Sequence, residues 1–182
     1  MKSHVAYPRI AAAAAAGVTA ALLLSGGAQA ITDSVFKYST VKTGWYSIPT
    51  AAMVPTTDTW AYSDSVFGSE LSNSGGACFS AGVNLPEGAT VTEIRAWYKS
   101  STVNDARTFF LRTNLPTGAT DSIVDQTSPD STGTRKPVAY AVTANNVTNN
   151  GRYSYSFGTC ANNSTTRFYG ARITYTYTTA GD

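Results

Sequence analysis

Few side chains in this 182-residue sequence could carry out chemistry. There is one histidine, His4, two cysteines, Cys78 and Cys160, and 11 Asp and Glu residues. Paired carboxylates can hydrolyse glycosides without a histidine, provided that both are aimed at one bond. The carboxylates considered for this role are Glu70, Glu87, Glu93, Asp105, Asp121 and Asp125. Most lie in or beside predicted turns, where acidic side chains make local hydrogen bonds, and Glu93 lies near Arg95 as a surface pair.

The first 30 residues have the anatomy of a secretory signal peptide. Lys2 and Arg9 form a positive start, residues 10–24 are apolar, and residues 28–30 form a small-x-small cleavage site. The apolar run is shorter than the roughly 17–25 residues of a membrane-spanning helix. We therefore expect a secreted, extracellular protein that loses His4 with its leader. Without histidine it can form no Ser-His-Asp, Cys-His or His-ligated metal site, so we predict that it is not an enzyme.

Removing the leader also changes the charge. Two of the 13 Lys and Arg lie within it, which leaves 11 against 11 acidic residues and a formal charge of zero. A neutral surface gives no electrostatic basis for binding nucleic acid or an anionic membrane. The remaining 152 residues suit a single domain with a real core.

The two cysteines predict one disulfide, because an even pair in an exported chain usually oxidises. The link would close a loop of about 82 residues and stabilise the fold by about 4–5 kcal/mol in the loop-entropy model. Pairing removes both sulfurs as nucleophiles or metal ligands. We expect this disulfide to cross-link the two sheets of the fold.

Metal binding is limited to a calcium hypothesis. Asp121, Asp125 and Asp130 lie near loops rich in carbonyl oxygens, the ligands that Ca²⁺ prefers. No Asp-x-Asp-x-Asp-Gly loop is present. We predict no metal site and no cofactor.

Short runs with a period of two predict an all-β fold. Alternation of apolar and polar residues indicates strands with one buried face. Turn-forming clusters separate the runs at a spacing of 8–14 residues. We predict eight or nine strands forming one antiparallel, jelly-roll-like β-sandwich over residues 59–182. The apolar rows are Tyr153, Tyr155 and Phe157; Ala171, Ile173, Tyr175 and Tyr177; Val138, Tyr140 and Val142; Phe109, Leu111 and Leu115; and Ile94, Ala96 and Tyr98.

Residues 31–58 differ from the rest of the mature chain. Gly44, Pro49 and Pro55 interrupt them, and their alternation is weaker. They could form edge strands of their own sandwich, or an extended arm that docks into a partner by strand addition. For the second interpretation the predicted partner-binding residues are Ile31, Val35, Phe36, Tyr38, Trp45, Tyr46 and Ile48.

Aromatic residues are the strongest positive feature. The mature chain contains Trp45, Trp60 and Trp97, ten tyrosines and seven phenylalanines, most of which must lie in the core. Trp97 falls opposite the row of Ile94 and Tyr98. It is therefore the candidate for an exposed side chain that stacks on a ligand.

One stretch of the chain resembles a recurring pattern of small secreted bacterial β-sandwich proteins. It is Val83-Asn84-Leu85-Pro86-Glu87-Gly88-Ala89-Thr90-Val91-Thr92-Glu93-Ile94-Arg95-Ala96-Trp97-Tyr98. The resemblance covers roughly residues 78–178 and supports the fold more than any activity. The chain is also similar to the small adaptor subunits of actinobacterial umbrella toxin particles. In that family the adaptor joins a lectin-bearing subunit to a large toxin-bearing subunit. This resemblance implies that residues 31–48 insert into a partner cleft.

Three hypotheses for function remain. The first is a non-catalytic protein-interaction module, an adaptor that forms a hetero-oligomer with other secreted proteins through residues 31–48. The second is a carbohydrate-binding module that uses spare aromatic residues such as Trp97. The third is an inhibitor of an extracellular hydrolase, a role that suits a rigid, disulfide-linked domain.

Overall fold

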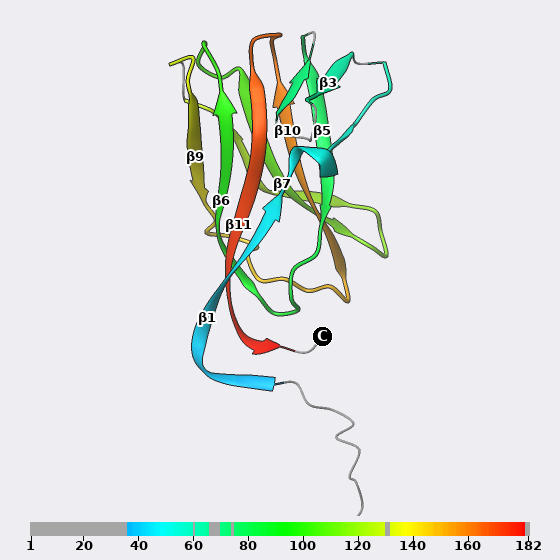
Figure 1. Cartoon of the computed structure of the whole chain (residues 1–182). Coiled ribbons are helices and arrows are strands. Elements are labelled where there is room, and N and C mark those ends of the chain that lie inside the picture. The colour runs from blue at the N-terminus through cyan, green and yellow to red at the C-terminus, as the bar shows by residue number, and fades with distance from the viewer. Residues whose placement is uncertain (1–35, 60, 66–69, 74, 130–131, 181–182) are drawn as a thin grey trace, which may run out of the picture. The chain divides into compact units, whose positions relative to one another are not determined.

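The computed structural model describes residues 36–59, 61–65, 70–73, 75–129 and 132–180 (Figure 1). The predicted signal peptide, Ile31, Val35 and Trp60 lie outside these residues. The described elements are β1 (Phe36–Ile48), the short 3-10 helix η1 (Thr50–Ala52), β2 (Val54–Pro55), β3 (Tyr62–Asp64), β4 (Leu71–Asn73), β5 (Ala77–Val83), β6 (Thr90–Lys99), β7 (Ala106–Asn114), β8 (Thr120–Thr127), β9 (Arg135–Ala141), β10 (Tyr153–Ala161) and β11 (Arg167–Ala180).

Two antiparallel sheets form a β-sandwich, as predicted from the period-two runs. Sheet A has the order β3-β4-β11-β6-β9, with β1 also paired to β11, and sheet B has the order β2-β5-β10-β7-β8. The described residues contain eleven strands rather than eight or nine, because β2, β3 and β4 are only two or three residues long. Runs this short carry no periodicity from which they could be predicted.

The core lies between the sheets and is built from the inward rows of the long strands. Ile94, Tyr98, Phe110, Phe157 and Ile173 are at most 1% exposed. The hydroxyl of Tyr98 hydrogen-bonds those of two threonines, one on β7 at 2.8 Å and one on β10 at 2.7 Å. These bonds tie sheet A to sheet B through a polar group that burial would otherwise penalise. Burial raises the pKa of Tyr98 above its usual range, so the hydroxyl stays protonated as a donor.

Strand β1 is an edge strand of its own sandwich. It pairs antiparallel with β11 from Ile48↔Ala171 to Phe36↔Ala180, and the two strands run together past the loops of the sandwich (Figure 1). At the other end of β11, Gly170 has a φ of +133° at a β-bulge. A side chain would be strained there, so the glycine lets β11 bend between β1 and β4. The segment 31–58 thus contributes an edge strand to each sheet, since β2 pairs with β5.

The predicted disulfide between Cys78 and Cys160 is present. The expectation that it cross-links the two sheets is wrong, because it joins the directly paired residues of the adjacent strands β5 and β10 in sheet B. Paired residues on neighbouring strands bring their Cβ atoms within disulfide reach. None of the described helices is long and apolar enough to cross a membrane.

Candidate functional site

The outer face of sheet B has a floor of small side chains. The large residues of its central strands point inward, with Phe79 on β5 and Tyr155 and Phe157 on β10 in the core. The alternate positions face outward, and every one of them is small. They are Cys78, Ser80 and Gly82 on β5, and Ser154, Ser156, Gly158 and Cys160 on β10. Since β5 and β10 are neighbours, this floor is two strands wide and roughly 20 Å long.

Strand β7 borders this row of small side chains on one side, and its outward side chains are larger. Phe109 lies opposite Gly158 and Leu111 opposite Ser156 in the strand register. Both side chains are half-buried on the outer face, because the inward position between them is taken by fully buried Phe110. A Cβ on Gly158 would lie 3.5 Å from the Phe109 side chain, so the glycine leaves the ring edge open to the floor.

Two hollows follow one another along this face. The first has a volume of about 230 Å³ and is lined by Phe109, Leu111, the disulfide and the serines beside it. The second, about 480 Å³, lies further along the same strands and is lined by Gly82, Ser154 and exposed Leu115, among others. Together they define what we call the sheet B groove: an apolar depression floored by Ser, Gly and Cys.

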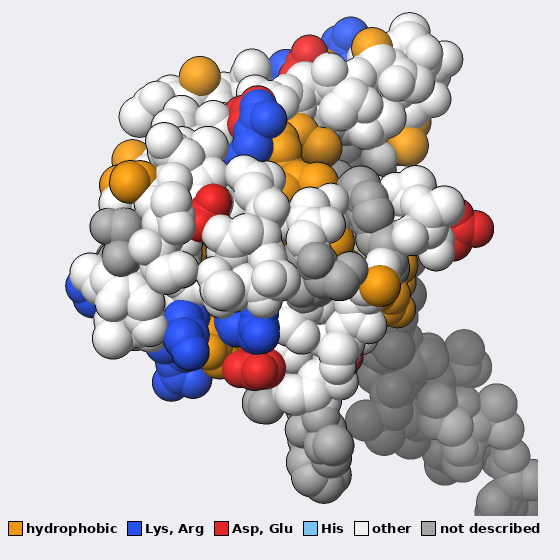
Figure 2. Space-filling model, turned by 90° about the horizontal axis from the view of Figure 1, so that it is seen from above, with side chains coloured by type: hydrophobic (Ala, Val, Ile, Leu, Met, Phe, Trp, Pro, Cys, Tyr) orange, Lys and Arg blue, Asp and Glu red, His pale blue; other side chains and the backbone are white. Residues whose placement is uncertain are grey.

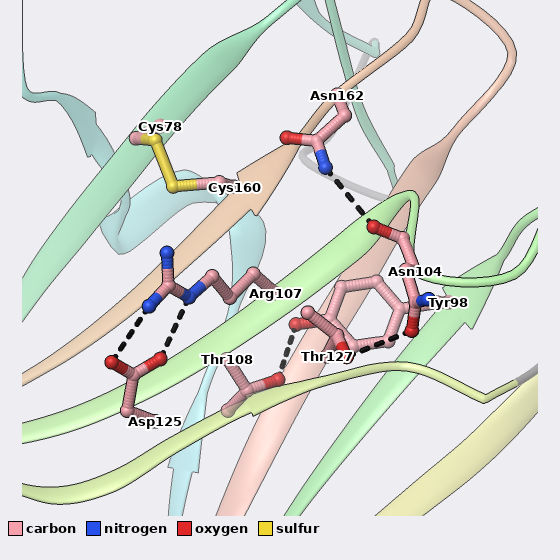
Figure 3. Close-up of polar contacts among 9 residues, drawn as sticks. All are labelled: Cys78, Tyr98, Asn104, Arg107, Thr108, Asp125, Thr127, Cys160 and Asn162. Carbon is pink, nitrogen blue, oxygen red and sulfur yellow. Dashed lines mark hydrogen bonds and ion pairs between the residues drawn. A yellow bond between two sulfur atoms is a disulfide. The ribbon is translucent and has the colours of Figure 1, made fainter.

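A charged pair borders the first hollow. Arg107 of β7 donates two hydrogen bonds of 2.7 Å to the carboxylate of Asp125 on β8, next to the disulfide (Figure 3). The Arg107 guanidinium also lies 4.7 Å from the centre of the Phe109 ring. Hydrogen bonding to Asp125 raises the pKa of Arg107 above its ordinary value. Figure 2 shows hydrophobic side chains gathered in a hollow beside a touching basic and acidic side chain.

The carboxylates considered for catalysis are engaged elsewhere. Asp121 pairs with Arg112 at 3.0 Å, Glu93 with Arg95 at 3.0 Å and Glu70 with Arg167 at 3.8 Å. Glu87 accepts a hydrogen bond from the backbone of Asn150, and Asp105 accepts one from the side chain of Asn163. Within the described residues, no group of three or more acidic, Cys or His side chains is placed to hold a metal ion.

The predicted partner-binding residues differ in exposure, and their role toward a partner stays a prediction. Ile48 is 2% exposed and belongs to the core, and Tyr46 is partly buried against it. Trp45 is 61% exposed on β1, and the Tyr38 ring packs edge-on against Tyr177. Phe36 begins β1, but its side chain lies outside the described residues, as do Ile31 and Val35.

Trp97 lies on the outer face of sheet A, on the opposite side of the sandwich from the groove. Its ring is covered by Arg172, whose guanidinium carbon is 5.9 Å from the ring centre. Sequence reasoning missed Phe109 and Leu111 as surface residues, because it placed them in an apolar row. The signal that could have found them is the row of Ser, Gly and Cys at alternate positions of β5 and β10.

A scan against protein-family models finds no match, and a search of curated proteins finds no similar sequence. Solved structures with a similar strand arrangement do exist. One is the C-terminal CBM6 of LamC, a marine laminarinase from Zobellia galactanivorans, with 17% identity and a TM-score of 0.47 over 71% of this chain and 98% of that one. The xylan-binding module CBM15 has 13% identity and a TM-score of 0.47 over 73% and 97% of the two chains.

A third similar structure is the carbohydrate-binding module CBM6cm-2 from Cellvibrio mixtus lichenase 5A in complex with cellotriose. It has 12% identity and a TM-score of 0.44 over 70% of this chain and 95% of that one. At this level the similarity concerns the arrangement of strands and not the residues of any site.

Proposed function

We propose that this chain is a secreted, non-catalytic module that binds a polysaccharide along the sheet B groove. The observation that carries the proposal is an apolar depression with a floor of small residues, an aromatic wall and a polar rim. Binding sites for small molecules and chains typically combine a concave apolar surface with a few oriented polar groups. The disulfide supports secretion, because disulfides persist in oxidising compartments.

A sugar chain matches the groove in shape. The groove follows two strands for roughly 20 Å, so it suits an extended ligand better than a compact one. Pyranose rings have C–H faces that pack on an aromatic ring and hydroxyl edges that hydrogen-bond. Phe109 and Leu111 offer the apolar contact, while Ser80, Ser156 and the Arg107–Asp125 pair offer donors and acceptors.

The charge of sheet B favours a neutral polysaccharide. Its strands contain two arginines and two aspartates, joined in the pairs Arg107–Asp125 and Arg112–Asp121. An ion pair of this kind has both donors and acceptors for hydroxyl groups but no net charge. We therefore expect xylans, glucans or galactans without acidic groups to be the ligands.

Substituting Phe109→Ala is expected to weaken binding to such a polysaccharide about two- to fivefold. The side chain is already largely buried, so the ligand covers at most about a third of the surface of a phenylalanine, worth roughly 0.5–1 kcal/mol. Affinity electrophoresis in gels that contain a neutral soluble polysaccharide measures the change. Val103→Ala is the control, because Val103 is 51% exposed in the loop between β6 and β7. Equal retardation of both variants, or none of the wild type across a panel of neutral glycans, would count against the proposal.

A second candidate function, a protein-interaction adaptor, is favoured by a different observation. Val41 and Trp45 of β1 are 64% and 61% exposed, and in the described residues β1 pairs only with β11. An exposed strand edge with apolar side chains is a surface to which another chain can add a strand. The umbrella toxin resemblance predicts the same region. Inhibition of a hydrolase stays a prediction that no feature of the fold favours.

The adaptor hypothesis predicts that Val41→Lys removes any protein partner that co-purifies from culture supernatant. A lysine on β1 would be covered by the added strand and desolvated without a partner for its charge. Deleting residues 31–48 is a poor test, because it would also remove Ile48 from the core. Val103→Lys, at a similarly exposed valine away from β1, is the control. Mass spectrometry that finds the same co-purifying proteins with both variants would exclude β1 as the docking strand.

A further inference from the structure

Charge is divided unevenly between the two sheets. The strands of sheet A contain eight Lys and Arg and two Asp and Glu, whereas those of sheet B contain two of each sign. A sheet with such an excess of one sign attracts ligands of the opposite sign. In Figure 2 several basic side chains gather on the side of the molecule away from the hydrophobic hollow.

Two of these basic residues are arginines on the adjacent strands β6 and β11. Arg95 of β6 and Arg172 of β11 are direct cross-strand partners, and both point to the outer face, since the alternate residues Ile94 and Ile173 are fully buried. Like charges directly opposite each other destabilise a sheet. Glu93 offsets part of this repulsion at Arg95, and an anion bound to Arg172 would reduce the rest.

Only one of the two arginines has an acidic partner. Glu93 lies 3.0 Å from Arg95 and accepts a hydrogen bond from its Nη2. No ion pair within the described residues involves Arg172, which lies instead over the ring of Trp97 at 5.9 Å. The Arg95 Nε also lies 3.0 Å from Glu93 Oε1, so the donor fork of Arg95 faces Glu93. Arg172 therefore carries the charge of the pair that no carboxylate of the described residues balances.

An exposed indole lies beside the pair. Trp45 of β1 pairs with Thr174, one row along from Arg172, whose own partner on β1 is Ser47. Diagonal neighbours on a sheet face are about 7–8 Å apart, within reach of long side chains. Trp45 is 61% exposed, so its ring is accessible on the same face as the two arginines.

We propose that the outer face of sheet A is a second binding site, for an acidic polysaccharide whose sugar rings bear carboxylates. Arg172 binds a carboxylate through its planar donor fork, Arg95 on the neighbouring strand adds positive charge, and Trp45 packs on the ring of a neighbouring sugar. Arginine matches a carboxylate in two parallel hydrogen bonds, which is the geometry that a uronic acid offers. The site is separate from the sheet B groove and does not depend on the proposed function of that groove.

The test uses polygalacturonate as the ligand and its fully methyl-esterified form as a neutral control. We expect the wild type to bind polygalacturonate at low ionic strength, to release it as salt is added, and to ignore the ester. Arg172→Gln should weaken binding about tenfold, because a hydrogen bond to a charged group is lost. Trp45→Ala should weaken it as well. Arg172→Lys, which keeps the charge without the fork, should fall between wild type and Arg172→Gln.

Arg152→Gln is the matched control, because it removes the same charge from an exposed position in the turn before β10. It should leave binding unchanged, and thermal melting should show that all variants are folded. Equal losses for Arg172→Gln and Arg152→Gln would mean a diffuse charge effect and overturn the proposal. Failure of the wild type to bind polygalacturonate, or equal binding of the ester, would also overturn it. Phe109→Ala should retain full affinity for this ligand, which separates the two sites.

Discussion

Replacing both cysteines by alanine is expected to lower the free energy of unfolding by about 4–5 kcal/mol. The Cys78–Cys160 disulfide closes a loop with a sequence separation of 82 residues, and the loop-entropy model assigns a cost of that size to losing the link. A typical domain is stable by only about 5–15 kcal/mol, so the variant would be marginal. Both sulfurs line the hollow on the outer face of sheet B, so alanine leaves no cavity in the core.

Urea unfolding followed by tryptophan fluorescence measures this loss, with reduced wild-type protein as a second route to the same state. The two should agree, because both keep the folded sheet and release the same constraint on the unfolded chain. A loss below about 1 kcal/mol would show that the unfolded chain stays compact without the link.

Gly82→Leu is expected to weaken polysaccharide binding in the sheet B groove by about ten- to a hundredfold. A Cβ built on Gly82 has no atom within 4 Å, so a leucine fits the folded protein without strain and occupies space meant for the ligand. A ligand in the groove would overlap the leucine side chain, and relieving that overlap would cost about 1–3 kcal/mol of binding free energy. Stability should stay equal or rise by about 0.5–1 kcal/mol, because glycine in a strand is unfavourable.

Gly151→Leu is the matched control. Gly151 lies in the turn before β10, and the nearest atom to its added Cβ is 3.7 Å away, so the same substitution is accommodated off the groove. Isothermal titration with a neutral polysaccharide and a thermal melt give the two readouts. A Gly82→Leu protein that is folded and still binds with wild-type affinity would rule out the groove as the site.

Strands with clean alternation could be predicted from the sequence residue by residue. Ile94 and Tyr98 of β6 are buried as expected, and Trp97 faces outward. Strand β7 misled the prediction because Phe109, Phe110 and Leu111 are consecutive, and a continuous apolar run fits either orientation. The register with β10 decides which of these side chains enter the core. Phe110 lies opposite buried Phe157, so Phe109 and Leu111 lie on the outer face of sheet B.

Long-range neighbours could not be predicted. The even number of cysteines indicated a disulfide, but it was expected to join the two sheets and it lies within sheet B. Two positions 82 residues apart carry no information on which sheet they share. The same holds for β1, whose partner β11 is the last strand of the chain. Ile48 was assigned to a partner for that reason, although its own core buries it.

By itself the sequence determined the fold class, the disulfide and the inward rows of the long strands, because alternation, turn residues and cysteine number are local properties of the chain. Only the tertiary structure decided where the candidate sites are. The groove needs the small residues of β5 beside those of β10, and the arginine pair needs β6 beside β11. Those strands are distant in sequence, and burial of the core between the sheets is what brings them together.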